Sequence, residues 1–528
     1  MATGMAMVMA TAMAAMTRRR AELLRWLPAL VLALVATGVA QAQAEAGAAG
    51  GTTVRPRIGV METWTDNLRL SEHDKDAALV TTVSPGISIV RGSGPLRGSL
   101  DYTLNGIAYL KSDQPSVLQN SLQAKGQAEL IEHRLFVDMI ASIGQQSASA
   151  FGLQSTPTLG SQSSVSTLAN ANRHEVGTLA LSPLFHSVVG SLFSLDLRGN
   201  FTRTEVRGSS LGDSRGAGGS LRLSGLGAGP LNWWATVSTQ QTVPKEARTN
   251  RLSSALVGLN FLPDPDLTLG VDAGRERNDF LASTGQSGAT GGVTAQWKPT
   301  PRTRVNGDWH RHEYGNSHSF SFEHRMSRSI WQLSDSRTVT VGSVAAGGVR
   351  SNYDQLFLLF TSLEPDPVKR DQVVRDYLQA RGLSPDAPAS AGFLSSGPSQ
   401  THNQMLGITL QGARSTLSAQ ANRIITSRLG SGLNQGDLAN NSRIEQRSYS
   451  LTASHQLTPI ASVSVVAAHQ QTLGDAGGRA ARLSSLTANW NGKLGPRFGV
   501  QFGARHAHFE GVTSYAENAV YANLTQQF

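Results

Sequence analysis

Apolar and polar residues alternate with a period of two along most of this chain. Within 190–206, for example, Leu195 and Leu197 share one face while Asp196 and Arg198 share the other. This period is typical of a β-strand with one apolar and one polar face. Such alternations, separated by turn signals, predict 22 strands. They are 54–64, 79–90, 96–109, 120–131, 134–146, 173–183, 190–206, 216–226, 230–242, 249–262, 266–277, 288–298, 302–314, 316–326, 329–341, 401–413, 415–427, 443–457, 460–473, 483–493, 497–509 and 515–528.

The connections between these strands fall into two classes. Those after even-numbered strands are tight, as at 263–265, whereas those after odd-numbered strands are mostly long, as at 147–172 and 342–400. A membrane barrel with both termini in the periplasm has short periplasmic turns and long outer loops. The one short odd connection, at Gly315 and Asn316, is a hairpin signal in its own right.

The final predicted strand, 515–528, supports a closed sheet. Val520, Ala522 and Leu524 alternate with polar residues, and Phe528 is the last residue. This ending resembles the C-terminal signal of bacterial outer-membrane β-barrels, in which the last strand pairs with the first and leaves no free edge. Leu524 and Phe528 are therefore the predicted barrel-assembly signal. The sequence predicts an all-β fold, a transmembrane antiparallel β-barrel of about 22 strands and of the outer-membrane type.

The composition fits such a barrel. The 528 residues include 54 Gly and are 39% hydrophobic, as expected when only one face of each strand is apolar. The absence of Cys excludes disulfide frameworks, thiolate metal sites and thiol nucleophiles. The net charge of +9 falls to +6 (42 basic minus 36 acidic residues) when residues 1–42 are removed. This excess is mild and no nucleic-acid-binding motif accompanies it, so we expect no nucleic-acid partner.

The N-terminal segment 1–42 is predicted to be a secretory signal peptide. Four arginines precede an apolar run, Trp26 to Val39, and a small-x-small cleavage site follows at 40–42. The run is too short to cross a bilayer as a helix. We expect a short periplasmic lead, 43–53, with no room for a plug domain, and then a barrel over 54–528 in the outer membrane of a Gram-negative cell.

The connection 342–400 has features of its own. It contains an apolar stretch, 353–363, and an amphipathic helix predicted over 368–382, with Asp366 and Pro367 as its start signal. Loops of this length are uncommon unless they have a role. By strand parity the loop is extracellular or folds back into the lumen, as a gate or plug.

Several short sequence words carry a family resemblance. They are Trp64–Leu68, Thr81–Ile87, Leu100–Tyr102, Leu135–Asp138, Ser334–Arg337 and Leu363–Pro367. In this order and spacing the chain resembles, over roughly residues 54–528, a family of outer-membrane β-barrels associated with the PEP-CTERM system. The resemblance implies an outer-membrane protein encoded with exosortase and exopolysaccharide machinery, and it implies no catalytic residue.

Two pairs of histidines are candidate metal ligands. His310 and His312 share one face of a strand, as do His506 and His508, but no third ligand is evident for either pair. The simpler interpretation is that these are polar residues near the outer rim. No Gly-x-Ser-x-Gly nucleophile elbow is present in a strand-to-helix context. We therefore expect no enzyme activity, no catalytic residue, no bound metal and no cofactor.

Charged residues of the strands are predicted to face the lumen, because a charge on the lipid face costs roughly 2–4 kcal/mol at mid-depth. Their signs are interleaved, which fits a salt-bridge lattice that stiffens the wall and equally a polar track for a hydrated polymer. The candidate lumen-lining residues are Arg198, Arg222, Asp272, Arg302, Arg304, Asp308, Arg325 and Arg505.

These features favour a channel or secretion scaffold associated with exopolysaccharide export and the PEP-CTERM–exosortase system. Its expected partners are outer-membrane lipid, the barrel-assembly machinery, and the exopolysaccharide with its periplasmic export apparatus. Two alternatives stay open. One is a general or solute-selective porin, and the other is a non-conducting surface-assembly factor.

Overall fold

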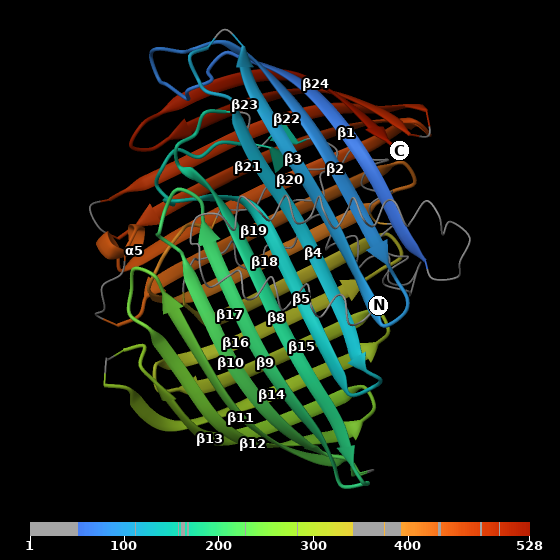
Figure 1. Cartoon of the computed structure of the whole chain (residues 1–528), viewed down its shortest axis with the longest axis vertical. Helices are drawn as coiled ribbons and strands as arrows, with labels where there is room; N and C mark the ends of the chain where they lie inside the picture. The colour runs from blue at the N-terminus through green and yellow to red at the C-terminus, as the bar shows by residue number, and fades with distance from the viewer. Residues whose placement is uncertain are drawn as a thin grey trace.

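In the computed structural model, 22 antiparallel strands form one sheet that closes into a barrel (Figure 1). The structure describes residues 51–110, 112–156, 158–159, 164–165, 168–227, 229–281, 284–341, 374, 392–430, 435–475, 478–495 and 497–528. The predicted signal peptide, 1–42, lies outside these residues. So does the predicted helix 368–382, apart from Val374, which is buried.

Every predicted strand is present in the barrel. The strands are β1 Thr52–Thr65, β2 Ala78–Arg91, β3 Leu96–Leu110, β4 Val117–Ile131, β5 Leu135–Ser147, β8 Arg173–Val189, β9 Phe193–Val206, β10 Ser214–Gly225, β11 Leu231–Pro244, β12 Asn250–Asp264, β13 Leu267–Asn278, β14 Gln286–Thr300, β15 Thr303–His312, β16 Gly315–Arg325, β17 Ser329–Val341, β18 Pro398–Gln411, β19 Ser415–Arg428, β20 Arg443–Thr458, β21 Ala461–Gly474, β22 Ala480–Gly495, β23 Phe498–Glu510 and β24 Tyr515–Gln527. Two short strands, β6 Thr158–Leu159 and β7 Ser164–Val165, pair separately, and one short helix, α5, spans Asp437–Asn440.

The predicted end of the strand 173–183 and the predicted start of the strand 190–206 are each several residues too early. Strand β8 continues through Pro183 as far as Val189. The pairing of β8 with β9 is interrupted there, passing from Leu181 opposite Phe201 to Leu184 opposite Arg198. Proline has no N–H to donate to the ladder, so the pairing with β9 is interrupted at Pro183, whereas on the other side Pro183 stays opposite Val137 of β5.

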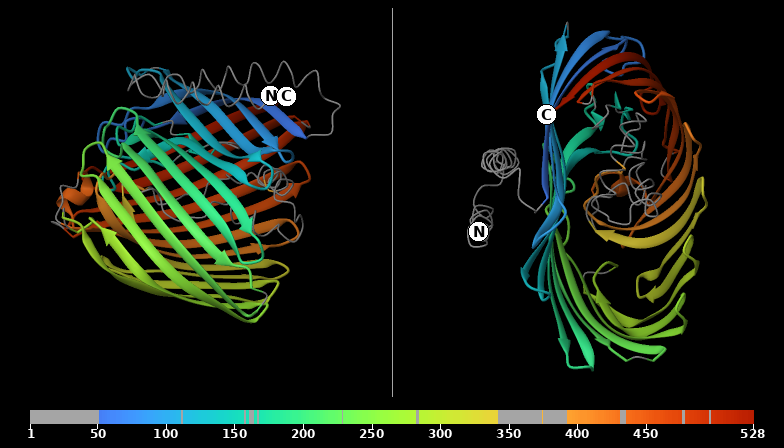
Figure 2. Two further views of the ribbon diagram at one scale, coloured as in Figure 1. Left: turned by 60° about the horizontal axis from the view of Figure 1, so that its bottom comes forward. Right: turned by 90° about the vertical axis from the view of Figure 1, so that its right-hand side faces the viewer.

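The last strand meets the first, as predicted. Strand β24 pairs with β1 from Gln527 opposite Arg57 to Ala519 opposite Thr65. The backbone N–H of Phe528 donates to the carbonyl of Pro56 at 3.0 Å. The sheet therefore has no free edge (Figure 2).

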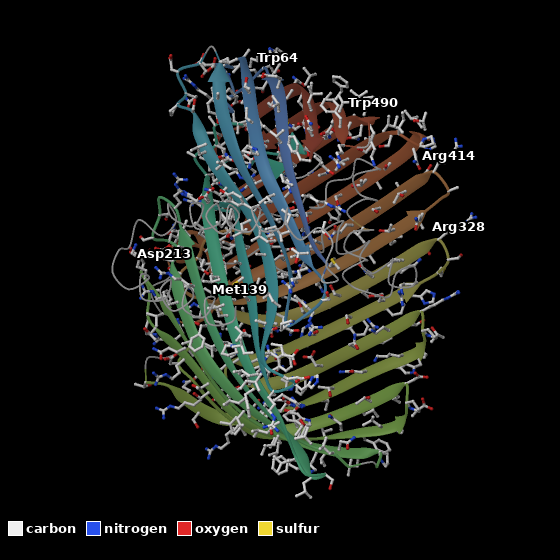
Figure 3. All side chains as sticks on the ribbon, turned by 45° about the vertical axis from the view of Figure 1, so that its right-hand side comes forward. Trp64, Met139, Asp213, Arg328, Arg414 and Trp490 are labelled. Carbon is white, nitrogen blue, oxygen red and sulfur yellow. The ribbon has the colours of Figure 1, made fainter. Side chains whose placement is uncertain are left out.

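The long and short connections are sorted to opposite ends of the barrel. Segments 66–77, 148–172 and 342–397 join strands at one end, which we call the long-loop rim, while turns of two to five residues join strands at the other, the short-turn rim. Figure 3 shows Arg328 and Arg414 at the short-turn rim, across the barrel from Asp213. The predicted hairpin turn at 315–316 lies two residues earlier, at 313–314. Gly315 has a φ of +122°, which favours glycine, and pairs with the last residue of β15.

The outer face of the sheet is apolar. Leu197, Val257 and Val271 on this face are 51%, 62% and 56% exposed. The alternate positions of many strands, which face inward, carry buried polar side chains. Trp297 and Trp331 are exposed near the short-turn rim, as an interfacial aromatic girdle requires. In the described part of the chain, no helix has the length and apolar character to cross a bilayer.

Candidate functional site: the barrel interior

Most of the predicted lumen-lining residues lie on the inner face of the wall. Arg198 follows the exposed Leu197 along β9, so its side chain points to the opposite, inner face. Its Nη1 lies 3.6 Å from Asp138 Oδ2. The guanidinium of Arg222 stacks over the ring of Trp234 at 4.6 Å. Each of these arginines therefore has a partner within the wall.

Two of the predicted residues come together around one histidine. Asp272 of β13 lies 3.1 Å from His310 Nε2, and Asp308 lies 3.9 Å from His310 Nδ1. The next inward histidine, His312, contacts Glu276 at 2.7 Å. Both rings lie near the long-loop rim, as expected, but each has its own carboxylate partner. They are arranged as two side-by-side pairs rather than as ligands of a single ion.

Three predicted arginines lie at the short-turn rim. Arg325 Nε is 3.6 Å from Glu323, and Glu323 pairs in register with Arg304 across β15 and β16. Arg302 is not on the inner wall, because it lies in the turn 301–302. Thr300 pairs with Thr303, so residues 301 and 302 form the turn between the two strands and β15 starts at Thr303. Proline suits such a turn because its φ is fixed.

Arg505, the last of the predicted lumen-lining residues, forms the most buried ion pair among the described residues. Its Nη2 and Nε lie 2.7 and 3.1 Å from the two carboxylate oxygens of Glu517, and the two side chains are 1% and 0% exposed. Thr65 donates to the same carboxylate at 2.9 Å. Two parallel N–H···O bonds of this kind fix geometry as well as charge.

Arg505 also ties a loop to the wall. Its Nη1 donates to the carbonyl of Thr156 at 3.0 Å, and the hydroxyl of Tyr515 donates to the carbonyl of Gln154 at 2.5 Å. Both acceptors belong to the connection between β5 and β8, which lies within the ring of strands in Figure 2 (right). The connection therefore folds into the barrel at the long-loop rim.

Three chain segments pack together there, and we call residues 148–156, 392–397 and 435–441 the loop plug. Their apolar side chains form one buried cluster with a residue at the start of β20. Leu394 N–H donates to the carbonyl of Ser147 at 3.2 Å, which attaches the second segment to β5. The cluster consists of Ala150, Phe151, Phe393, Leu438 and Ile444.

A carboxylate links the first and third segments of the plug. Asp437 of α5 accepts hydrogen bonds from the Ala150 backbone N–H at 2.6 Å and from the Ser149 hydroxyl at 2.9 Å. Burial raises the pKa of Asp437, in spite of these hydrogen bonds, because it disfavours the charged form. The plug is therefore held by specific polar contacts as well as by its apolar cluster.

Only part of the plug could be predicted from the sequence. The connection 342–400 was expected to be extracellular or to fold into the lumen, and its described end, 392–397, is buried inside the barrel. The contribution of 148–156 was missed, because a Ser-, Gln- and Ala-rich loop gives no periodic signal. Its few apolar residues, among them Ala150, Phe151 and Leu153, follow no period of two.

One expectation about charge is wrong. Asp335 and Arg337 share a strand face with the exposed Trp331 and Leu333, so they point outward rather than into the lumen. Asp335 contacts His318 and His402 at 2.8 Å each. The energetic cost that keeps charges off the lipid face applies at mid-depth and falls toward the interfaces. His506 and His508 also lie on the outer face, bonded separately to Asn518 and Glu510.

A closed sheet, an apolar exterior and a polar, loop-filled interior define a transmembrane β-barrel. No protein-family model and no curated protein matches the sequence.

Several solved barrels are similar in fold. The siderophore receptor PirA of Pseudomonas aeruginosa aligns with 91% of this chain and 81% of its own, at 10% identity and a TM-score of 0.43. The iron transporter FrpB of Neisseria meningitidis aligns with 92% of this chain and 83% of its own, at 8% identity and a TM-score of 0.46. OccAB4 of Acinetobacter baumannii aligns with 90% of this chain and 98% of its own, at 9% identity and a TM-score of 0.31. Likeness at this level carries nothing about function to this chain.

Proposed function

We propose that this protein is a gated outer-membrane channel through which a hydrated polar polymer, an exopolysaccharide, leaves the cell. The observation that carries the proposal is the loop plug, since three separate connections fold inward and attach to the inner wall at the same rim. A barrel that only anchored other proteins at the surface would have no need to bring its loops inside. A plug held by a few identifiable contacts can be displaced as a unit.

The inner wall supports a polar cargo. Its side chains include interleaved acids, bases and amides, such as Asp138 on β5 and Arg198 and Asn200 on β9, with β8 between the two strands. Amide and hydroxyl groups suit the hydroxyls of a sugar, and mixed charge suits a hydrated chain without selecting one sign of ion. The link to exopolysaccharide in particular, and to a PEP-CTERM–exosortase system, comes from the family resemblance.

Liposome swelling with graded sugars tests the gate. We expect the purified wild-type barrel to pass sugars slowly, and a variant with 149–171 replaced by a short Gly/Ser linker to pass mono- and disaccharides rapidly, because the first segment of the plug is gone. The matched control replaces the turn 511–514, at the same rim, where Val512 is 83% exposed, and should behave as wild type.

The alternatives give different results. Wild-type protein that passes small sugars as fast as the linker variant would be a porin without this gate. No swelling with either protein would favour a non-conducting assembly factor. In a deletion strain, we expect polymer to be retained in the periplasm, and normal secretion would contradict the export role while leaving the channel result intact.

A further inference from the structure

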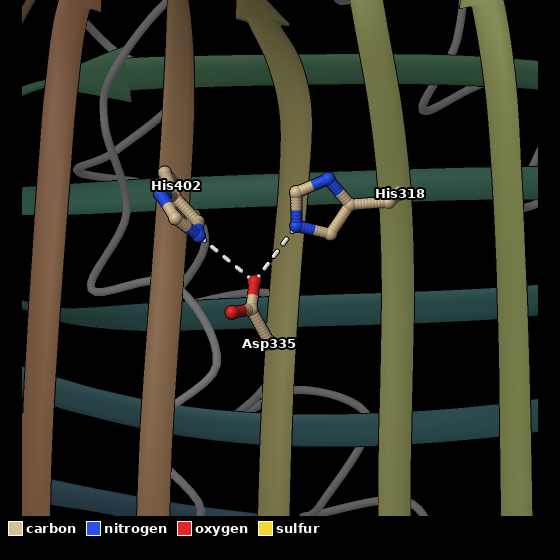
Figure 4. A group of neighbouring side chains, drawn as sticks. All are labelled: His318, Asp335 and His402. Carbon is tan, nitrogen blue, oxygen red and sulfur yellow. Dashed lines mark hydrogen bonds and ion pairs between the residues drawn. The ribbon is translucent and has the colours of Figure 1, made fainter.

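On the outer face of the barrel, three side chains of metal-ligating type converge from three adjacent strands (Figure 4). They are His318 of β16, Asp335 of β17 and His402 of β18. The Nε2 atom of each imidazole lies 2.8 Å from the same carboxylate oxygen, Asp335 Oδ1. The three ligand atoms all lie within 4.8 Å of one another, and no other group of three such ligands is this close among the described residues.

The cluster lies at the margin of the outer apolar band. On β16 and β17, the next outward residues toward the short-turn rim are Phe320 and Leu333, which are 39% and 42% exposed. Toward the long-loop rim, the next outward residue on β17 is Arg337, whose guanidinium donates a hydrogen bond to Gln400 Oε1 at 2.6 Å. The outer surface therefore changes from apolar to polar at this level, where water and lipid headgroups replace hydrocarbon.

Neighbouring side chains hold the carboxylate in place. Gln404 Nε2 donates to Asp335 Oδ2 at 2.8 Å, which leaves Oδ1 directed at the two imidazoles. Gln404 is in turn oriented by Arg423, whose Nη1 lies 3.4 Å from its Oε1. Outer contacts of this kind orient metal ligands and commonly affect affinity.

The side chain of Arg337, the nearest cation in the ladder, does not occupy the space between the three ligand atoms. Arg337 lies directly between His318 and His402 along the ladder. Its guanidinium is directed toward Gln400, on the side of the long-loop rim. The point on which the three ligand atoms converge is thus bounded by two imidazole rings and one carboxylate.

We propose that His318, Asp335 and His402 form a binding site for a divalent transition metal, with Zn²⁺ as the probe. Two imidazoles and one carboxylate are a common set for such ions, and a fourth position stays open to water or to another oxygen ligand. Zn–N and Zn–O distances of about 2.0–2.2 Å require the two Nε2 atoms and Oδ1 to surround the ion, and these atoms already lie within 4.8 Å of one another. The side chains are 31%, 33% and 28% exposed, so an ion can reach them.

A bound ion would have a structural consequence for the gate. Strands β17 and β18 are joined by the connection 342–397, whose described end, 392–397, belongs to the loop plug. An ion shared by β16, β17 and β18 would cross-link the three strands at the base of that connection. Ion binding itself does not require the proposed transport, because the three ligands lie on the outer face of the wall.

Zn²⁺ titration by calorimetry of the full-length barrel, purified in detergent without a polyhistidine tag, tests the site. We expect one Zn²⁺ per chain for wild type and loss of that binding in the His318→Ala/His402→Ala double variant. Gln404→Ala should weaken binding about 10–100-fold, since it removes an outer contact of a ligand. The control is His469→Ala, which removes an outward histidine whose Nδ1 lies 2.9 Å from the Ser484 hydroxyl, and this variant should bind as wild type.

Co²⁺ gives a second readout that a purely structural role would not change. Wild type with Co²⁺ should show visible ligand-field bands that the double variant lacks. Asp335→Asn, which keeps the shape of the side chain, replaces the double variant if the latter does not fold. Absence of stoichiometric Zn²⁺ binding in wild type, equal loss in His469→Ala, or Co²⁺ bands unaffected by Asp335→Asn would overturn the proposal.

Discussion

Glu517→Ala is expected to lower the free energy of unfolding of the barrel by about 3–5 kcal/mol, because it leaves the Arg505 guanidinium buried without its carboxylate. Both side chains are essentially inaccessible to solvent, and Thr65 would lose its hydrogen-bond acceptor as well. Urea titration of the protein folded in lipid vesicles, followed by tryptophan fluorescence, measures the change.

Two comparisons isolate the ion pair. The double replacement Arg505→Met with Glu517→Met should recover most of the loss, since apolar groups of similar volume remove both buried charges together. Glu510→Ala, on β23, breaks the exposed contacts with Arg482 and His508 and should cost less than about 1 kcal/mol. A Glu517→Ala loss no larger than that of Glu510→Ala would show that the buried pair does not stabilise the wall.

Phe393→Ala is expected to open the plug without unfolding the barrel. The ring is fully buried against Phe151, Leu438 and Ile444, and its truncation costs about 3–5 kcal/mol at a site that cannot collapse completely. If this cost acts on plug docking alone, the undocked population rises by about a hundredfold to a few thousandfold. Single-channel recordings in a planar bilayer should then show frequent large openings that are rare in wild type.

The matched control is Phe201→Ala. This residue is 49% exposed on the outer face of β9, so its truncation removes an aromatic side chain of the same size without touching the plug. Its conductance should equal that of wild type, and both variants should keep the β-sheet circular dichroism of the parent. Wild-type conductance for Phe393→Ala, with the fold intact, would mean that the apolar cluster does not close the lumen.

The barrel itself could be predicted from sequence because each strand can be recognised from its own residues. A period of two with one apolar face identifies a strand, and the alternation of long and short connections orders the strands in space without any long-range information. The deviations have local causes. Strand β8 continues past Pro183, where only its pairing with β9 is interrupted. Arg302 lies in the two-residue turn between Thr300 and Thr303, and Gly315 follows a tight turn instead of forming it.

The plug and the outer histidine cluster could not be predicted in the same way. Thr156 meets Arg505, and Phe393 meets Ile444, across large separations in sequence, and no periodic pattern marks such contacts. The rule that charges face the lumen correctly places Arg505, but it applies to the hydrocarbon core. It therefore does not place Asp335, which lies at the margin of the apolar band.

Disulfide cross-linking of the first and last strands tests the closed barrel most directly. The chain has no cysteine, so Val60→Cys with Leu524→Cys introduces a single pair, at positions that face each other in the ladder and are both on the outer face. We predict that mild oxidation of the folded protein joins this pair nearly completely, giving faster migration on a non-reducing denaturing gel, whereas Val60→Cys with Val520→Cys, offset by four residues, stays open. Failure of the first pair to join, or equal joining of the offset pair, would contradict a sheet that closes between β1 and β24.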